Sequence, residues 1–223
     1  MSYDSFIAEV NAEFRQEKAL AFWKRYGFSI ISAVVIFVLG VAIYQIYHHE
    51  QMKKAGLIGE ALIKGLDFAD TRHFDKALKQ LEDVKATDFG GYPSLARLRE
   101  ASLLMEQGDT VKSVETFDFV AADKKAPLIL QKVAKIRAAY ILVDTGTLDE
   151  VKKRVEDMAN DIDPMRMSAR EALGLAAYKA DKMSDAIYYF QKIVEEDALG
   201  SKIADRARIM LELIQSEGKV NRG

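Results

Sequence analysis

One uninterrupted apolar segment near the N-terminus constrains this chain more than any other feature. Residues 27–47 are GFSIISAVVIFVLGVAIYQIY, without a single Asp, Glu, Lys, Arg or His. A helix rises about 1.5 Å per residue, so a helix of this length covers the roughly 30 Å hydrocarbon core of a bilayer. The segment predicts a transmembrane helix that separates an N-terminal arm, residues 1–26, from a larger polar part, residues 48–223.

Two other kinds of segment are also long and apolar. A cleaved signal peptide has an apolar core of roughly 7–15 residues and a small-residue cleavage site. Here the run is longer, follows twenty-six residues and leads into Tyr47, His48 and His49. The buried core helix of a soluble protein normally carries a polar stripe, whereas this segment has almost no polar side chains. We therefore expect an uncleaved anchor.

The residues that flank the segment predict its orientation. Amphipathic aromatic rings favour the membrane interface, and both ends of the segment carry them: Trp23, Tyr26, Tyr44 and Tyr47. Four cations precede the segment closely and two follow it: Arg15, Lys18, Lys24 and Arg25, then Lys53 and Lys54. Because positive charge favours the cytoplasmic side, we expect a cytoplasmic N-terminus and residues 48–223 on the opposite side of the membrane.

The arm and the residues after the segment have simpler patterns. Phe6, Ile7, Val10 and Phe14 recur at three- and four-residue spacing, which predicts an amphipathic helix that continues into the span. Residues 48–54 are expected to form a short linker to a domain over residues 55–223.

Composition and motifs argue against enzyme activity, metal binding and nucleic-acid binding by this chain. The chain has 32 Lys+Arg and 34 Asp+Glu, and this balance disfavours nucleic-acid binding. It has no cysteine, and its histidines, His48, His49 and His73, lack the spacing of metal ligands. No phosphate-binding glycine loop, nucleophile elbow or zinc-protease motif is present. We expect no enzyme activity, no cofactor, no metal and no small-molecule substrate.

Beyond the span the apolar residues recur with a period of about thirty-six residues. Four sets keep the internal spacing +4, +3 and begin at residues 77, 113, 151 and 186. They are Ala77, Leu81 and Val84; Ser113, Phe117 and Val120; Val151, Val155 and Met158; and Ala186, Phe190 and Ile193. A fixed period of this size, with helical spacing inside each unit, is typical of an α-solenoid.

The last unit matches the tetratricopeptide pattern best. Leu173-Gly174 occupies the place of its leucine–glycine pair in helix A, and Ala186 and Phe190 occupy the places of its helix B residues. Small residues at Gly174 and Ala186 let the helices cross closely, and Phe190 then fills the space between them. The sequence thus predicts an all-α fold of about four degenerate repeats; a non-repetitive helical bundle is the alternative.

The end of the repeat array has its own signals. Residues 201–217 are expected to form a helix that caps the last repeat, with Ile203, Ala207, Met210, Leu211 and Ile214 on its apolar side. Pro164 is expected to end helix B of the third unit, because proline interrupts a helix.

The helix A positions of such an array line its concave groove. Six of them, proposed here to bind a partner, are apolar or aromatic: Leu98, Met105, Ile136, Tyr140, Leu175 and Tyr178. Glu171 falls in the same set of positions. A groove of this kind can hold an extended segment or an amphipathic helix of another protein. The alternative is that these side chains pack against the capping helix or the neighbouring repeat.

An anchor followed by degenerate repeats resembles a known arrangement. Residues 9–18, EVNAEFRQEK, and residues 22–27, FWKRYG, leading directly into the span, are similar to the YfgM-like family of bacterial inner-membrane tetratricopeptide proteins. The resemblance implies a single-pass protein with its C-terminal domain in the periplasm. It also implies a role ancillary to the SecYEG translocon, together with periplasmic chaperones.

These observations lead to one function and one alternative. The first is a non-catalytic, membrane-anchored scaffold that binds proteins at the translocon. The alternative is a regulator of envelope assembly or cell division that binds a cell-wall enzyme through the same groove.

Overall fold

The computed structural model describes residues 3–196 and 200–217, and of residues 3–19 it describes the backbone alone. The amphipathic pattern expected for residues 6–14 therefore lies outside the described side chains. The chain divides into two compact units, the first ending at Leu57 and the second beginning at Ile58. Each is described here by itself.

Helix α1 (Tyr3–Asp70) forms the first unit as far as Leu57. The last turns of this helix, from Ile58 onward, belong to the second unit. From Leu20 onward this helix is long and apolar enough to cross a membrane. Its apolar side chains, such as Phe28, Ile36 and Phe37, are largely exposed. A membrane anchor and a signal sequence both have this character. Residues 48–54, expected to be a linker, are helical within α1.

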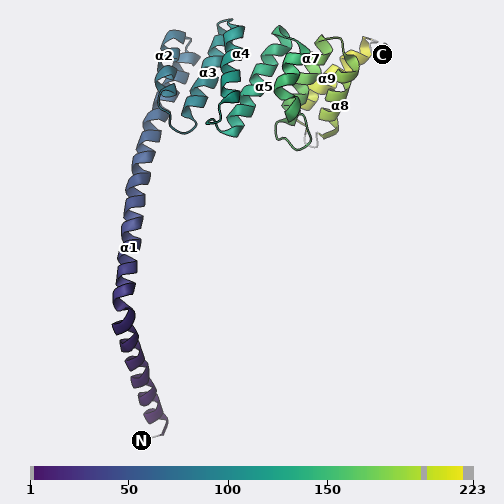
Figure 1. Cartoon of the computed structure of the whole chain (residues 1–223). Helices are drawn as coiled ribbons and strands as arrows, with labels where there is room; N and C mark the ends of the chain where they lie inside the picture. Colours follow the sequence, from purple (N-terminus) through teal and green to yellow (C-terminus); the bar gives the residue numbers. More distant parts are fainter. Residues whose placement is uncertain (1–2, 197–199, 218–223) are drawn as a thin grey trace. The chain divides into compact units, whose positions relative to one another are not determined.

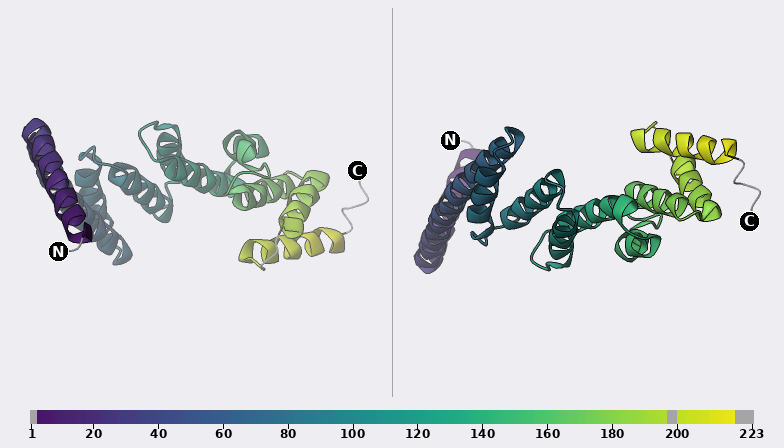
Figure 2. Two further views of the ribbon diagram at one scale, coloured as in Figure 1. Left: turned by 90° about the horizontal axis from the view of Figure 1, so that it is seen from below. Right: turned by 90° about the horizontal axis from the view of Figure 1, so that it is seen from above.

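The second unit is built from consecutive helices (Figures 1 and 2). After the end of α1 come α2 (Phe74–Lys85), α3 (Tyr92–Glu106), α4 (Thr110–Ala122), α5 (Leu128–Thr145), α6 (Leu148–Val155), η1 (Glu156–Met158), α7 (Arg166–Lys179), α8 (Met183–Glu196) and α9 (Lys202–Ser216). Each helix packs mainly on its neighbours in the sequence, and α5 also packs on α7. The described residues contain no strand. The expected all-α fold of repeated helix pairs is confirmed.

The repeat spacing corresponds to the core of these pairs. All twelve residues of the four sets are buried, each on helix α2, α4, α6–η1 or α8. Helices α4, α6 and α8 each pack on helix A of the same unit and on the helix that follows, and α2 packs on the end of α1 and on α3. Each helix B therefore joins neighbouring pairs. A helix pair cannot bury its apolar face alone, so stacking of successive pairs supplies the hydrophobic core.

Small residues let the two helices of a pair approach each other. A Cβ added at Gly174 would lie 2.8 Å from the ring of Phe190, and one added at Gly65 would lie 3.1 Å from the side chain of Leu81. In the second pair the Ser113 hydroxyl, itself buried, donates a 2.7 Å hydrogen bond to the carbonyl oxygen of Ala101. The predicted crossing position at Gly174 is therefore a true point of close contact, and Gly65 and Ser113 are its counterparts in the first two pairs.

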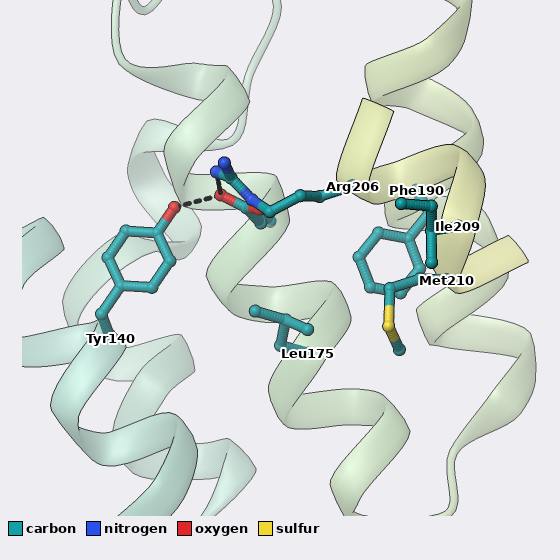
Figure 3. A pocket seen from close by; sticks show the side chains of 7 residues that line it. Tyr140, Leu175, Phe190, Arg206, Ile209 and Met210 are labelled. Carbon is teal, nitrogen blue, oxygen red and sulfur yellow. Dashed lines mark hydrogen bonds and ion pairs between the residues drawn. The ribbon is translucent and has the colours of Figure 1, made fainter. Parts of the chain in front are cut away.

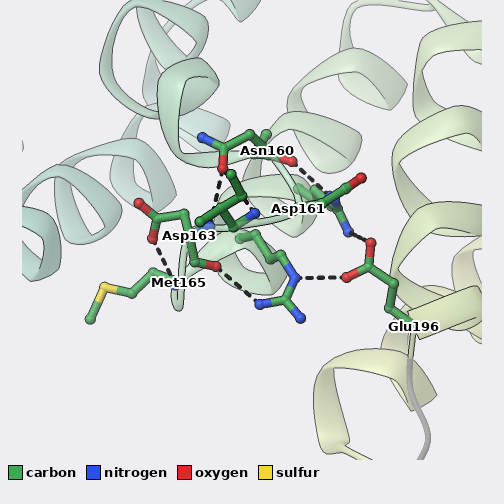
Figure 4. A network of polar contacts seen from close by, with 9 residues as sticks. Asn160, Asp161, Asp163, Met165 and Glu196 are labelled. Carbon is green, nitrogen blue, oxygen red and sulfur yellow. Dashed lines mark hydrogen bonds and ion pairs between the residues drawn. The ribbon is translucent and has the colours of Figure 1, made fainter.

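The end of the third pair differs from the prediction. Pro164 does not end the helix, because the last helical residue is Met158 in η1. The chain turns earlier, at Asn160, whose side-chain oxygen accepts hydrogen bonds from the backbone N–H groups of Ile162 and Asp163 (Figure 4). The buried Arg170 also donates from Nε to the Ala159 carbonyl at 2.9 Å, which satisfies a carbonyl at the helix end.

The same arginine ties this loop to helix α8. Arg170 donates to Asp161 and, at 2.7 Å, to Glu196, which also accepts a 2.7 Å hydrogen bond from Arg166 (Figure 4). The hydrogen bonds from Arg166 and Arg170 hold the pKa of the Glu196 carboxyl below its usual value. The loop before α7 and the end of α8 are thus joined through ion pairs.

We predict that Gly174→Ala destabilises the repeat domain, although alanine favours a helix by about 1 kcal/mol over glycine. The added methyl group must displace the Phe190 ring from a filled core, and overpacking costs about 1–3 kcal/mol. In a Phe190→Leu background the loss should disappear. Urea unfolding of the full chain in detergent, followed by circular dichroism, measures both values. Gly56→Ala is the matched control, because a Cβ at Gly56 meets nothing within 4 Å.

Candidate protein-binding groove

A pocket of about 400 Å³ lies where helices α5, α7 and α9 meet (Figure 3). Helices α5 and α7 are the A helices of the third and fourth pairs, and α9 follows the last pair. Seven residues line the pocket: Tyr140, Glu171, Leu175, Phe190, Arg206, Ile209 and Met210. The pocket thus lies on the helix A side of the array, where a tetratricopeptide groove is expected.

One wall of the pocket is apolar. Leu175 from α7 faces Ile209 and Met210 from α9, and the ring of Phe190 from α8 lies behind them. Phe190 is fully buried, whereas 61% of Ile209 is exposed. The wall therefore combines a fixed base in the core with an apolar rim that solvent reaches.

The other wall carries a charged group at its base. The side chain of Glu171 is only 3% exposed and accepts hydrogen bonds from two elements. Arg206 of α9 donates from Nε to Oε1 at 2.5 Å and from Nη2 to Oε2 at 2.8 Å. The Tyr140 hydroxyl of α5 donates to Oε2. A carboxylate on α7 thereby connects α5, α7 and α9, the helices on the groove side.

These contacts explain how a carboxylate can be buried here. A buried charge is costly unless it is paired and hydrogen-bonded, and Glu171 is both. Burial, together with the bond to Glu171, raises the pKa of the Tyr140 phenol well above its usual value, so the phenol remains a donor. The bond to Glu171 likewise raises the pKa of the Arg206 guanidinium, which remains charged.

Two further side chains join the helices beside the pocket. The Tyr178 hydroxyl lies 3.1 Å from both carboxylate oxygens of Glu217, at the C-terminal end of α9. Lys179 donates to the backbone carbonyl of Asp144 at 2.5 Å, linking α7 to the end of α5. Polar contacts therefore hold α9 to α7 at both ends, with the apolar wall between them.

The six predicted groove residues occupy different surroundings. Tyr140 and Leu175 line the pocket, and Tyr178 forms the bridge to Glu217 beside it. Ile136 is only 8% exposed and belongs to the largest core cluster, so it offers little binding surface. On α3, Leu98 is half-buried against the second core cluster, whereas Met105 is 39% exposed. Binding of a partner by these residues stays a prediction.

Sequence reasoning missed the contribution of α9. The apolar spacing of residues 201–217 predicts only a cap over the last repeat, and it does not indicate a role for Arg206 or Ile209. A signal was present: Ala207 stands 33 residues after Gly174, close to the repeat period, and is fully buried. Helix α9 therefore takes the place of a fifth helix A.

The pocket has no feature of a metal site. Within residues 20–196 and 200–217, no three or more His, Cys, Asp or Glu side chains come together in a way that could hold a metal ion.

Comparison with known proteins identifies the fold. A protein-family model described as a tetratricopeptide repeat-like domain matches residues 20–211. The chain belongs to this family. It is the YfgM-type family of tetratricopeptide repeat-like domains, and such domains bind proteins and are typically non-catalytic. A search of the curated proteins and a search of the solved structures each returned no match.

We predict that Arg206→Ala destabilises the tetratricopeptide repeat-like domain, because it leaves the Glu171 carboxylate buried without its counter-ion. An unsatisfied buried acceptor costs about 1–3 kcal/mol. The double variant Arg206→Ala, Glu171→Gln should recover most of the loss, since it removes the buried charge. Urea unfolding of the full chain in detergent measures both variants. Lys202→Ala, at an exposed position on the same helix, serves as control; an equal loss in that variant would contradict the assignment.

Proposed function

We propose that this chain is a non-catalytic, membrane-anchored scaffold that binds segments of other proteins through the concave side of its repeat domain. The pocket between α5, α7 and α9 carries this proposal. It combines an apolar wall with a small number of fixed polar groups, as binding sites commonly do. An exposed apolar rim, formed mainly by Ile209, gives a partner surface to bury.

The apolar part of α1 serves in this proposal as a permanent anchor. Only ten residues separate Tyr47, the end of the apolar segment, from Ile58, where the repeat unit begins. Even a fully extended chain covers at most about 3.6 Å per residue, so this connection is shorter than roughly 40 Å. The start of the repeat domain is therefore held close to the bilayer, which favours partners that are at the membrane or pass through it.

The proposed partners are the SecYEG translocon and a periplasmic chaperone. The resemblance of residues 9–18 and 22–27 to the YfgM-like family supports this assignment, as does membership of the family. In this role the repeat domain binds polypeptides that emerge from the translocon or the chaperones that receive them. A regulator that binds a cell-wall enzyme is the alternative that the experiments below distinguish.

We predict a cytoplasmic N-terminus and a periplasmic C-terminus, because four cations precede the apolar segment and two follow it. A reporter active only in the periplasm, fused after Gly223, should be active, and the intact anchor should stay with the membrane fraction. A reporter active only in the cytoplasm is the matched control. Activity of that control alone would remove the translocon assignment.

We predict that a photoreactive amino acid at Ile209 or Met105, introduced in intact membranes, crosslinks to translocon subunits, chaperones or secreted proteins in transit. Both positions are exposed on the helix A side of the array. Tyr188 is the matched control, because it is comparably exposed but lies on helix B of the last pair.

Mass spectrometry of the crosslinked products separates the possibilities. Recovery of a cell-wall enzyme alone at Ile209 would favour the alternative function. Equal crosslinking of the same proteins at Tyr188 would contradict a role for the groove.

A further inference from the structure

We infer that the pocket between α5, α7 and α9 binds a protein segment in which a large apolar side chain stands beside an Asp or Glu. The apolar side chain fills the space against Leu175 and Met210, and the carboxylate binds the outer edge of Arg206. This inference rests on the proposed function, because it specifies the partner of the same groove.

Arg206 has hydrogen-bond donors to spare. A guanidinium carries five N–H donors, and Arg206 gives only its Nε and one Nη2 donor to Glu171. Its side chain is 55% exposed, so a partner can reach the guanidinium from solvent. The bidentate pair with the buried Glu171 fixes the guanidinium plane. A donor group already held in place loses little conformational entropy when it binds a second acceptor.

Two other arginines of this domain bind two carboxylates each. Arg170 bridges Asp161 and Glu196. Arg99 bridges Asp70, at 2.9 Å, and Glu106, at 3.5 Å. Within the described part of the chain Arg206 pairs with Glu171 alone. A carboxylate from a partner would complete the same arrangement.

The charge that a partner meets in the pocket is positive. Of the seven lining residues only Glu171 and Arg206 are charged, and Glu171 lies at the base with 3% of its side chain exposed. A cationic side chain would therefore approach an exposed guanidinium before it reached the carboxylate. An anionic side chain meets donors of matching geometry, since arginine binds carboxylates in a planar, directional way.

The apolar part of the segment follows from the shape of the pocket. A space of about 400 Å³ against Leu175, Ile209 and Met210 is large enough for one aromatic or large aliphatic side chain. The polar contacts of Arg206 and Glu217 with α7 hold α9 in place on either side of this apolar wall. The pocket therefore suits one inserted side chain rather than a continuous helix laid across it.

An internal acidic residue fits better than a chain end. Capture of a C-terminal carboxylate commonly uses several backbone donors in a concave nest. This pocket offers one guanidinium, and no second cation lines it among the described residues. The free N–H donors of the one guanidinium, that of Arg206, can bind one side-chain carboxylate.

The test uses the full chain in detergent and an array of twelve-residue peptides. Each peptide holds a central Phe or Leu, and the flanking positions vary. We expect the bound peptides to be enriched in Asp or Glu beside the central residue. For the tightest peptide, replacing that Glu by Gln should weaken binding about tenfold, measured by fluorescence anisotropy.

Variants of the protein locate the carboxylate contact. The double variant Arg206→Gln, Glu171→Gln removes both charges and keeps a hydrogen-bonding amide at each position, which protects the fold. It should weaken the Glu peptide about tenfold and leave the Gln peptide unchanged. Lys202→Gln, at an exposed position on α9 outside the pocket, is the matched control and should bind both peptides as the original chain does.

The outcomes separate this inference from the proposed function. If the peptides bind the Ile209→Ala variant more weakly than the original chain but show no preference for Asp or Glu, the inference is wrong and the groove is still a binding site. Enrichment in Lys or Arg, or an equal effect of the double variant on both peptides, would also overturn the inference. If the Ile209→Ala variant binds every peptide as tightly as the original chain does, the proposed function itself is wrong.

Discussion

Close approach between paired helices is the constraint on which the rest of this domain depends. At Gly174 the backbone of α7 comes so near the ring of Phe190 that no side chain fits between them, and Gly65 lies almost as close to Leu81. Phe190 is completely buried in consequence, and its ring supports the pocket from behind. The contact between α7 and α8 at Gly174 and Phe190 therefore also supports the surface of the groove. The geometry of the groove follows from the packing of α7 on α8, and it does not rely on a mobile loop.

Polar groups add a second level of organisation to this apolar packing. Apolar contact is not directional, so it sets the spacing of helices better than their alignment. The Glu171 carboxylate accepts hydrogen bonds from α5 and α9 at once, and this defines how three helices line up on the groove side. Arg170 has the same role on the loop side, where it joins the end of the third pair to α8. Both charged groups are buried, so a misaligned array would leave them without partners.

The sequence predicted those parts of the fold that periodic packing determines. The spacing of Ala186, Phe190 and Ile193, with its three counterparts, located the buried face of every helix B. Individual surroundings were harder to predict. Ile136 and Tyr140 are one helical turn apart on α5, yet the first is in the core and the second lines the pocket. The helix end at Met158 depends on Asn160 and on the distant Arg170, and a pattern of apolar spacing contains no information about such contacts.

Helix α9 has two functions at once, since it covers the last repeat and supplies one wall of the pocket. In a solenoid each element contacts mainly its neighbours, and within the described part of the chain α9 packs on α7 and α8. Its solvent-facing residues can therefore diverge without disturbing the helices upstream. Within a family that shares the same repeats, a substitution at Ile209, or a joint substitution of Arg206 and its buried partner Glu171, offers the shortest evolutionary route to a new partner preference. The C-terminal helix is thus the place where related proteins can acquire different clients while the scaffold stays the same.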